Sequence, residues 1–442
     1  NIGFFYLKCD FLNFYSIFMK ILIYEDGKYK NLFPLSMLRG VFDIKIGINS
    51  IKERIEYISG NKFDTELLCR KSIASYLSEI HCNKINQITK DNYLLLNGRV
   101  IFSETLLKYL LSQKDKNSFY VFNNEIIAAF ISKDISMQLK SSLENSNEGV
   151  ISNELLTGLK LDQVNLEDDF EVTVVNYPWD IVNYILHNGL SDDFNYFNIE
   201  NKKYLKQKDH KEKEHLINYK DIHISKTAIL KSNVVLDASE GKIIIDENAV
   251  IEPFTYIKGP AYIGKNSLLK SGTKIYGPCV IGENSKVSGE IAESVFHSYV
   301  NKQHDGFIGH SYICPFVNLG ADTVTSDLKN NYSKIKINFN KEGKEINTGM
   351  QLLGSIIGDH SKTSINTMLN TGTIIGIFAN IFGGGFPDKV IESFAWFDSG
   401  KNSDEIQPKY DLDKAIETAK IVMKRRNLDL SRNYEDLVKI YF

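Results

Sequence analysis

A single apolar side chain recurs every six residues through the middle of this chain. The positions of the series are Ile245, Ile251, Ile257, Ile263, Leu269, Ile275, Ile281 and Val287. Small residues stand two places before the last seven of these: Ala249, Thr255, Ala261, Ser267, Thr273, Cys279 and Ser285. Neither an α-helix nor a simple strand has a six-residue period. The spacing therefore predicts a solenoid whose flat faces each stack one inward apolar residue, with a small residue at each tight corner.

The same frame returns further along the chain after an interruption. It reappears at Ile357, Leu369, Ile375 and Ile381, with Ser355, Ser361, Thr367, Thr373 and Ala379 two places ahead and Thr363 as a polar exception. Residues 288–352 break the frame and are rich in His, Asn and Asp. A break in a solenoid is typical of a loop on one face, often the binding face. We therefore expect a parallel β-helix domain over 221–400, with 288–352 as a loop.

Residues 19–200 have a different organisation, in which short apolar runs alternate with helix-like stretches. The runs predicted as strands are Ile21–Tyr24, Tyr93–Leu96, Val100–Phe102, Phe119–Phe122 and Ile126–Ile131, and the helix-like stretches include 50–58 and 70–80. This alternation predicts an α/β domain. The fold class expected for the whole chain is thus α/β plus all-β.

Three further segments complete the predicted organisation. Residues 1–18 are aromatic-rich but interrupted by charges, and we expect the natural chain to start at Met19, with 1–18 a disordered or non-native leader. Residues 201–220 hold seven lysines and three acidic residues, which is typical of a solvated linker. The stretch DLDKAIETAKIVMKRR has helical periodicity and predicts a C-terminal helical appendage over 401–442.

The composition excludes several classes of protein. The chain is 43% apolar and 24% charged with a net charge of −3, so it lacks the basic footprint of a nucleic-acid-binding protein. Its five cysteines contain no CxxC pair, which argues against a zinc ribbon or a disulfide framework and favours a reducing compartment. The N-terminal segment is too short and too polar to span a bilayer and lacks the features of a secretory signal. We expect a cytoplasmic protein without membrane attachment.

The hexapeptide coil followed by NKQHDGFIGHSYICPFVNLGADT (301–323) resembles the acetyltransferase half of the GlmU-like family of bifunctional sugar-1-phosphate nucleotidyltransferase/acetyltransferases. The segments YPWDIV (177–182) and LFPLSMLRGVFDIKIGINSIKERI (32–55) are similar to the end and the opening of that family's nucleotidyltransferase domain. The resemblance implies a nucleotidyltransferase-like, Rossmann-like domain over 19–200. It also implies a left-handed parallel β-helix with acyltransferase activity.

The resemblance places candidate catalytic residues in the segment 301–323. In the family a histidine is followed fourteen residues later by an Asn-(Ile/Leu)-Gly-Ala motif, and here His304 precedes Asn318 by that spacing. His304 would be the general base for acyl transfer from acetyl-CoA or another acyl-CoA, a role that suits a pKa near neutrality. Asn318 would contact the sugar or the acyl carbonyl, and Phe307 and His310 would lie at the substrate. The alternative is that His304 and His310 only cap a loop of the coil.

Two departures affect how a ligand would be held on the coil. The family binds its sugar phosphate or uridine with an arginine and a lysine, but the matching positions here are Tyr276 and Ala292. Loss of both cations removes the main phosphate anchor. Lys302 lies nearby and is our candidate replacement for substrate binding.

The N-terminal domain departs further from its family. The loop after the first predicted strand carries only Gly27, where the family has a glycine-rich phosphate loop. Arg99 stands where the first magnesium aspartate is expected, and Ile185 where the second ligand is expected. Mg²⁺ is therefore expected only if this domain is active. Arg39 and Arg99 could bind phosphate directly, while the alternative for Arg99 is a surface salt bridge.

These observations leave three functions open. The first is acyl-CoA-dependent acyl transfer to a sugar or sugar nucleotide, and the second is sugar-1-phosphate nucleotidyl transfer by the N-terminal domain. The third is a non-catalytic sugar-nucleotide-binding protein that keeps only the fold. In each case the expected ligand is a sugar phosphate or nucleotide sugar, and the resemblance implies a homotrimer built through the coil.

Overall fold

The computed structural model describes residues 19–81, 85–113, 117–166, 170–197, 215–338, 345–401 and 407–442. The predicted leader 1–18 and most of the predicted linker 201–220 lie outside these residues. Contacts divide the chain into two compact units, the second of which begins at Tyr177 and also takes in Phe33–Met37 and Ile46–Ile48. The main division thus falls after Asn176, before the boundary expected at residue 200. No helix in the described parts of the chain is both long and apolar enough to cross a membrane.

The first unit is built on a mixed sheet with strand order β2-β1-β3-β6-β5-β7. Its strands are β1 (Lys20–Tyr24), β2 (Thr65–Leu68), β3 (Tyr93–Asn97), β5 (Ser118–Phe122), β6 (Glu125–Ile131) and β7 (Asp162–Asn165), with β4 (Val100–Phe102) and β8 (Val172–Val174) as a separate antiparallel pair. Strand β1 runs parallel to both β2 and β3, whereas β6 is antiparallel to β3. All five strands predicted from apolar runs are present, and the predicted α/β domain is confirmed.

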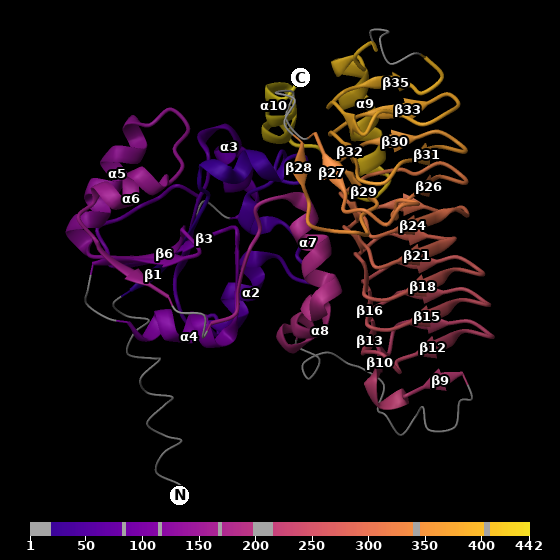
Figure 1. The fold of residues 1–442 in the computed structure, drawn as a ribbon, viewed down its shortest axis with the longest axis horizontal. Helices are drawn as coiled ribbons and strands as arrows, with labels where there is room; N and C mark the ends of the chain where they lie inside the picture. Colours follow the sequence, from indigo (N-terminus) through magenta and orange to yellow (C-terminus); the bar gives the residue numbers. More distant parts are fainter. Residues whose placement is uncertain are drawn as a thin grey trace, which may run out of the picture. The chain divides into compact units, whose positions relative to one another are not determined.

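The helices of this unit lie around the sheet (Figure 1), and each of them buries apolar side chains. They are α2 (Ile51–Ile58), α3 (Lys71–Ile80), α4 (Glu104–Ser112), α5 (Lys133–Asn145) and α6 (Asn153–Gly158), with short 3-10 helices η1 (Gly27–Leu32) and η2 (Val41–Asp43). The helix predicted over 50–58 begins after Ser50 because the Ser50 side chain and Glu53 form a reciprocal capping box. The helix predicted over 70–80 is α3.

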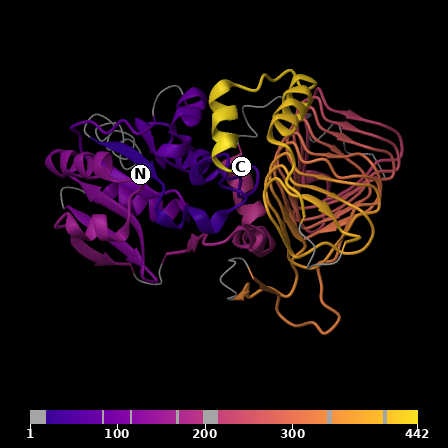
Figure 2. The same ribbon diagram turned by 90° about the horizontal axis from the view of Figure 1, so that it is seen from above.

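The second unit opens with α7 (Pro178–Tyr184), a π-helical turn η3 (Ile185–Gly189), α8 (Leu190–Asp193) and η4 (Phe194–Tyr196), and then becomes a parallel β-solenoid. The first face of the solenoid consists of β10 (Ile222–Ile224), β13 (Ile243–Ile245), β16 (Ala261–Ile263), β19 (Cys279–Ile281), β22 (Val295–Phe296), β25 (Tyr312–Ile313), β29 (Ser355–Ile357), β32 (Thr373–Ile375) and β34 (Val390–Ile391). The second face consists of β11 (Ile229–Leu230), β14 (Val250–Ile251), β17 (Leu268–Leu269), β20 (Lys286–Val287) and β23 (Asn301–Lys302), and further along of β30 (Lys362–Thr363), β33 (Asn380–Phe382) and β35 (Trp396–Asp398). The third face consists of β9 (Leu216–Ile217), β12 (Val235–Asp237), β15 (Tyr256–Lys258), β18 (Lys274–Tyr276), β21 (Glu290–Ala292) and β24 (Phe307–Gly309), with the pair β26 (Val324–Thr325) and β31 (Met368–Leu369). The predicted β-helix is confirmed, and Figure 2 shows its faces along the coil axis.

The six-residue series forms the interior of the coil. Every residue from Ile245 to Val287 in that series is fully buried, and all belong to one hydrophobic cluster. The polar exception Thr363 also points inward, where its hydroxyl lies 2.7 Å from that of Thr323. Burial of each large aliphatic side chain contributes about 1.5–3 kcal/mol, so this stack is the main source of stability in the coil.

The segment that breaks the frame is for the most part still coil, which corrects the loop expected over 288–352. Strands β21 to β26 continue the three faces, but neighbouring rungs are offset by 15 to 17 residues instead of 18, as in the pairs Val280–Val295, Lys274–Glu290 and Val295–Tyr312. The shortened turns shift the six-residue frame without ending the solenoid. Only the segment between β26 and β29 leaves it, carrying the antiparallel hairpin β27 (Lys336–Ile337) and β28 (Ile346–Asn347).

One corner of the coil, between the first and second faces, repeats the left-handed backbone conformation on each turn from Asn248 onward. Asparagines occupy it at Asn248, Asn266 and Asn284, a residue type that tolerates positive φ. On later turns aromatic rings replace them and stack at centroid distances of 4.6–5.2 Å. We call this set the aromatic corner; its members are Tyr299, Phe316, His360, Phe378 and Phe394.

The predicted C-terminal appendage consists of α9 (Leu412–Lys424) and α10 (Arg432–Ile440), which rest on this corner (Figure 2). The Tyr434 hydroxyl of α10 lies 3.0 Å from Nε2 of His360, and Phe442 packs edge-on against Phe394. Arg426, just after α9, donates to the Asn284 carbonyl at 3.2 Å. The aromatic corner therefore fixes the helices on the coil.

Replacement of one inward residue tests the stacked core. Ile275→Ala should lower the free energy of unfolding by about 2–5 kcal/mol, because it leaves a cavity in a closely packed interior. The matched control is Lys274→Ala, one position away and pointing outward, which should change stability by no more than about 0.5 kcal/mol. Urea denaturation of both variants measures the difference; equal losses would contradict the assigned inward and outward positions.

Candidate functional site

The segment predicted to carry the catalytic residues crosses the corner between the second and third faces. Strand β23 ends at Lys302, the chain turns through Gln303 to Gly306, and β24 begins at Phe307. His304 lies in this turn with an exposed side chain, and no described residue hydrogen-bonds to its imidazole. An exposed, unengaged imidazole can accept a proton from a bound acceptor.

Lys302 occupies an inward position of the coil, which the hexapeptide pattern otherwise gives to apolar residues. It is fully buried and lies in register with the inward Val287 of the neighbouring rung. Its ammonium donates to the carbonyl oxygens of His304 and Asp305 at 2.7 and 2.9 Å. Burial lowers the pKa of Lys302 to about 8. The side chain of Lys302 thus binds the backbone that carries His304, and substrate binding by Lys302 stays a prediction.

Asn318 lies on the second face, two rungs beyond Lys286. In register, the outward residues of four successive rungs are Lys286, Asn301, Asn318 and Lys362. Asn301 donates to the side-chain oxygen of Asn318 at 2.6 Å, and Gln303 in turn donates to Asn301 at 2.8 Å. This chain of amides links Asn318 to the residue that precedes His304.

Phe307 and His310 have different surroundings. Phe307 is half-buried on the third face, beside Glu290 of the neighbouring rung, and so does not share a face with Asn318. His310 is buried, with Nδ1 2.8 Å from Asp327 and Nε2 2.7 Å from Glu293. Burial disfavours the charged ring, but the hydrogen bond to Asp327 and the ion pair with Glu293 outweigh it and raise the pKa of His310 to about 9. His310 thereby holds the start of the segment between β26 and β29 against the coil.

A pocket of about 340 Å³ opens on the second face beside the aromatic corner. Its lining residues are Lys286, Tyr299, Asn301, Gln303, Phe316, Val317, Asn318, Lys362, Val422, Arg425 and Arg426. We call this the cationic pocket. Of these residues the sequence analysis had singled out only Asn318. Lys286 and Lys362 could have been found, because each directly precedes an inward position of the six-residue frame, Val287 or Thr363, and must therefore point outward.

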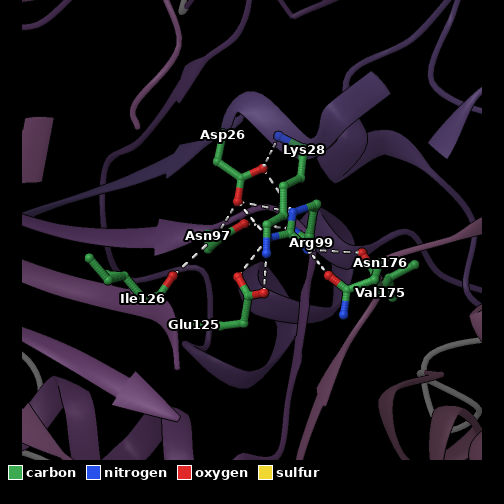
Figure 3. Close-up of polar contacts among 8 residues, drawn as sticks. All are labelled: Asp26, Lys28, Asn97, Arg99, Glu125, Ile126, Val175 and Asn176. Carbon is green, nitrogen blue, oxygen red and sulfur yellow. Dashed lines mark hydrogen bonds and ion pairs between the residues drawn. The ribbon is translucent and has the colours of Figure 1, made fainter. Parts of the chain in front are cut away.

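The first unit contains a separate polar cluster at the carboxyl ends of β1 and β3, which are parallel neighbours. Asp26 follows β1 and Arg99 follows β3, so the two side chains meet at this edge of the sheet (Figure 3). Arg99 Nε donates to both carboxylate oxygens of Asp26, at 2.8 and 3.0 Å, and Nη2 donates to one of them at 2.6 Å. Ligands of open α/β sheets bind at such edges, so this is where a nucleotide site is expected.

The remaining donors of Arg99 are also engaged. Nη1 donates to the Val175 carbonyl at 3.2 Å and to the Asn176 side chain at 2.8 Å, while Nη2 lies 3.3 Å from Glu125. Lys28 forms a further ion pair with Glu125. Arg99 is fully buried, so the surface salt bridge considered as its alternative is in fact a buried one. The phosphate role stays a prediction and would require this network to open. Arg39 is half-buried in the connection between η1 and η2.

The edge does not fit a Mg²⁺ ion as these side chains are arranged. Both carboxylate oxygens of Asp26 accept hydrogen bonds from Arg99, whose guanidinium supplies the positive charge at this place. Across the described ranges, no group of three or more His, Cys, Asp and Glu side chains is arranged to hold a metal ion. We therefore derive no metal-dependent step for this unit.

A second buried ion pair lies next to the first. Glu25 is fully buried and accepts from Arg70 Nη1 at 2.7 Å, from the Arg70 backbone at 2.9 Å and from the Val41 backbone at 3.0 Å. The two consecutive acidic residues after β1 thus each have a buried arginine partner. Ion pairs therefore hold the loop after β1, at the place where the family resemblance implies a glycine-rich loop.

Comparison with known proteins agrees with this organisation. Residues 21–202 match the family model described as sugar nucleotidyl transferase. The bifunctional sugar-1-phosphate nucleotidylyltransferase/acetyltransferase of Sulfurisphaera tokodaii is 37% identical over 147 residues, which are 33% of this chain and 36% of the relative. The match thus spans about a third of that relative's length. These findings confirm the resemblance to the GlmU-like family.

Two solved structures are similar at low scores. A protein named as an acetyltransferase from Bacillus cereus is 15% identical and covers 49% of this chain and 98% of its own, with a TM-score of 0.26. A protein named as a glucose-1-phosphate thymidylyltransferase from Bacillus anthracis is 12% identical and covers 39% and 94%, also with a TM-score of 0.26. At these scores neither likeness bears on the activity of this chain.

Replacement of Arg99 distinguishes its two roles. If Arg99 neutralises Asp26, Arg99→Met should cost about 3–5 kcal/mol of stability, because it leaves a buried carboxylate without its counter-charge. The double variant Arg99→Met with Asp26→Asn should recover most of that loss. Urea denaturation measures both. Unchanged stability of Arg99→Met, together with weaker binding of a nucleoside triphosphate, would favour the phosphate role instead.

Proposed function

We propose that the chain is a cytoplasmic transferase of sugar-nucleotide metabolism whose coil moves an acyl group from an acyl-CoA to a sugar or sugar nucleotide. The observation that carries the proposal is the exposed imidazole of His304. The turn that bears it lies beside the second face, and the Lys302 ammonium donates to the backbone carbonyl of His304. The name of the Sulfurisphaera tokodaii relative, which includes both a nucleotidylyltransferase and an acetyltransferase, supports this class of reaction.

In the proposed reaction the acceptor's amine or hydroxyl attacks the thioester carbonyl carbon. A carbon–nitrogen or carbon–oxygen bond forms, the carbon–sulfur bond breaks, and coenzyme A leaves as a thiol. His304 takes the proton that the acceptor loses and passes it to the departing thiolate, so that no external acid or base is consumed. A positioned base of this kind contributes on the order of 10²–10⁴ in rate.

The inward ammonium of Lys302 gives the proposal its geometric basis. Two hydrogen bonds to consecutive carbonyls, those of His304 and Asp305, restrict the peptide planes of the turn. The side chain of His304 is therefore presented from a fixed backbone although it is itself exposed. Fixed placement of a base lowers the entropic cost of reaching the reactive arrangement. We propose that Asn318 binds the substrate, because it lies on the second face and is linked through Asn301 to Gln303, the residue before His304.

Nucleotidyl transfer by the first unit is a second candidate, which the match of residues 21–202 to the sugar nucleotidyl transferase model favours. The pairing of Asp26 with Arg99 weighs against a metal-assisted reaction of this kind. We further propose that the chain assembles as a homotrimer through the coil, as its resemblance implies. Exposed apolar side chains on the coil, such as Ile365 and Trp396, are consistent with such an interface.

Replacement of His304 tests the acyltransferase. His304→Ala should lower the rate of thiol release from acetyl-CoA by about 10²-fold or more, because the proton acceptor is lost. The assay uses a panel of amino and hydroxy sugars as acceptors. The matched control is Lys231→Ala, which removes another exposed coil side chain and should leave the rate unchanged.

Light scattering on both variants and on the unmodified chain gives the mass in solution. We expect a trimer in every case, because neither substitution touches the inward stack. A monomer at micromolar concentration would contradict the assembly. Acceptor-dependent thiol release that survives in His304→Ala would contradict the catalytic assignment, and no such release from the unmodified chain would favour a binding protein.

A further inference from the structure

The charged side chains that line the cationic pocket are all basic. Four basic side chains line it: Lys286 and Lys362 from the second face, and Arg425 and Arg426 from the end of α9. Among the described residues that line it there is no carboxylate. The two arginines face the coil together with Val422, as expected for residues three and four positions apart on a helix.

These four cations differ from other lysines of the same coil. Lys258, Lys265, Lys270 and Lys274 each form an ion pair with a glutamate of a neighbouring turn, at 2.6–3.4 Å. Within the described residues, neither the two lysines nor the two arginines of the pocket form an ion pair. Arg426 and Lys362 bond only to backbone carbonyls, those of Asn284 and His360. Ion pairs thus offset the charges of those four lysines, whereas among the described residues no ion pair offsets the four cations of the pocket.

Burial makes the uncompensated charge costly. Lys362 is half-buried, and burial lowers its pKa to about 8. Burial and the neighbouring Arg425 lower the pKa of Arg426 as well. A cation that is desolvated without a partner destabilises the chain, and an anionic ligand would remove that cost.

The amides of the pocket add directed hydrogen-bond donors. The chain from Gln303 through Asn301 ends at Asn318, whose side-chain oxygen is occupied. Its amide nitrogen donates to none of the described residues, and it lines the pocket. A free amide donor beside four cations suits phosphate oxygens, which accept several hydrogen bonds at once.

We propose that the cationic pocket binds the phosphate groups of the coil's ligand, with Lys286, Lys362, Arg425 and Arg426 as the anchors. These residues take the place of the phosphate anchors that the family resemblance located at Tyr276 and Ala292, which lie on the third face. The chemistry recognised is a phosphate or pyrophosphate group, and two ligands of the proposed reaction carry one: coenzyme A and a nucleotide sugar. The inference deepens the proposed function and names a site for it.

The test measures binding directly, so that it does not depend on turnover. Isothermal titration of the full chain with coenzyme A, with a uridine diphosphate sugar and with inorganic pyrophosphate gives three separate affinities. Lys286→Gln and Lys362→Gln should each weaken binding by roughly tenfold or more, since a charge-assisted contact is lost. Lys231→Gln is the matched control, an exposed coil lysine outside the pocket, and should bind like the unmodified chain.

The outcomes separate the ligand sources. Loss of coenzyme A binding alone identifies the pocket with the acyl donor, loss of nucleotide-sugar binding alone identifies it with the acceptor, and loss of both supports a shared anion site. Arg425→Gln is a third pocket variant. Because the Arg425 side chain is exposed, this variant tests the pocket even if Lys286→Gln or Lys362→Gln fails to fold. Unmodified affinity for all three ligands in all three pocket variants would overturn the proposal. His304→Ala should bind normally, so failure of the catalytic assignment remains distinguishable.

Discussion

The parallel register between successive turns of the coil is the constraint on which the rest of the second unit depends. Residues of a short strand point alternately inward and outward, and hydrogen bonds hold each strand in register with the next turn. Every side chain is thereby assigned to the core or to a face. The register gives the second face its outward column of Lys286, Asn301, Asn318 and Lys362. The same register sends Lys302 inward, where its ammonium donates to two carbonyls of the turn that carries His304.

Buried ion pairs hold the loop after β1 in the first unit, whereas a stack of apolar side chains holds the coil of the second unit together. Two buried arginines neutralise Glu25 and Asp26 directly after β1, at the sheet edge where a nucleotidyl transferase would hold phosphates and metal. A buried ion pair contributes little net stability, but loss of one partner is costly, so the arrangement is difficult to change one residue at a time.

Much of the fold could be predicted from the sequence because it rests on periodic burial. The inward series from Ile245 to Val287 was found from its six-residue spacing, and the five N-terminal strands were found from short apolar runs. The coil strands within 288–352 were missed, because shortened turns change the period although the hydrogen-bonded register persists. The partners of the buried charged side chains were harder to predict. The partners of Arg99 come from segments up to 77 residues away in the sequence, and no local pattern connects them. Lys302 was predicted to bind substrate, and the inward direction of its side chain follows from its register with Val287.

We infer that the ligand of this chain is held on the second face of the coil and presented to the turn that carries His304. A crystal structure of the full chain soaked with coenzyme A and a nucleotide sugar tests this most directly. We expect phosphate density against Lys286 and Lys362, with the reactive end of that ligand directed toward His304. Phosphate density confined to the edge around Asp26 and Arg99, with an empty second face, would contradict it.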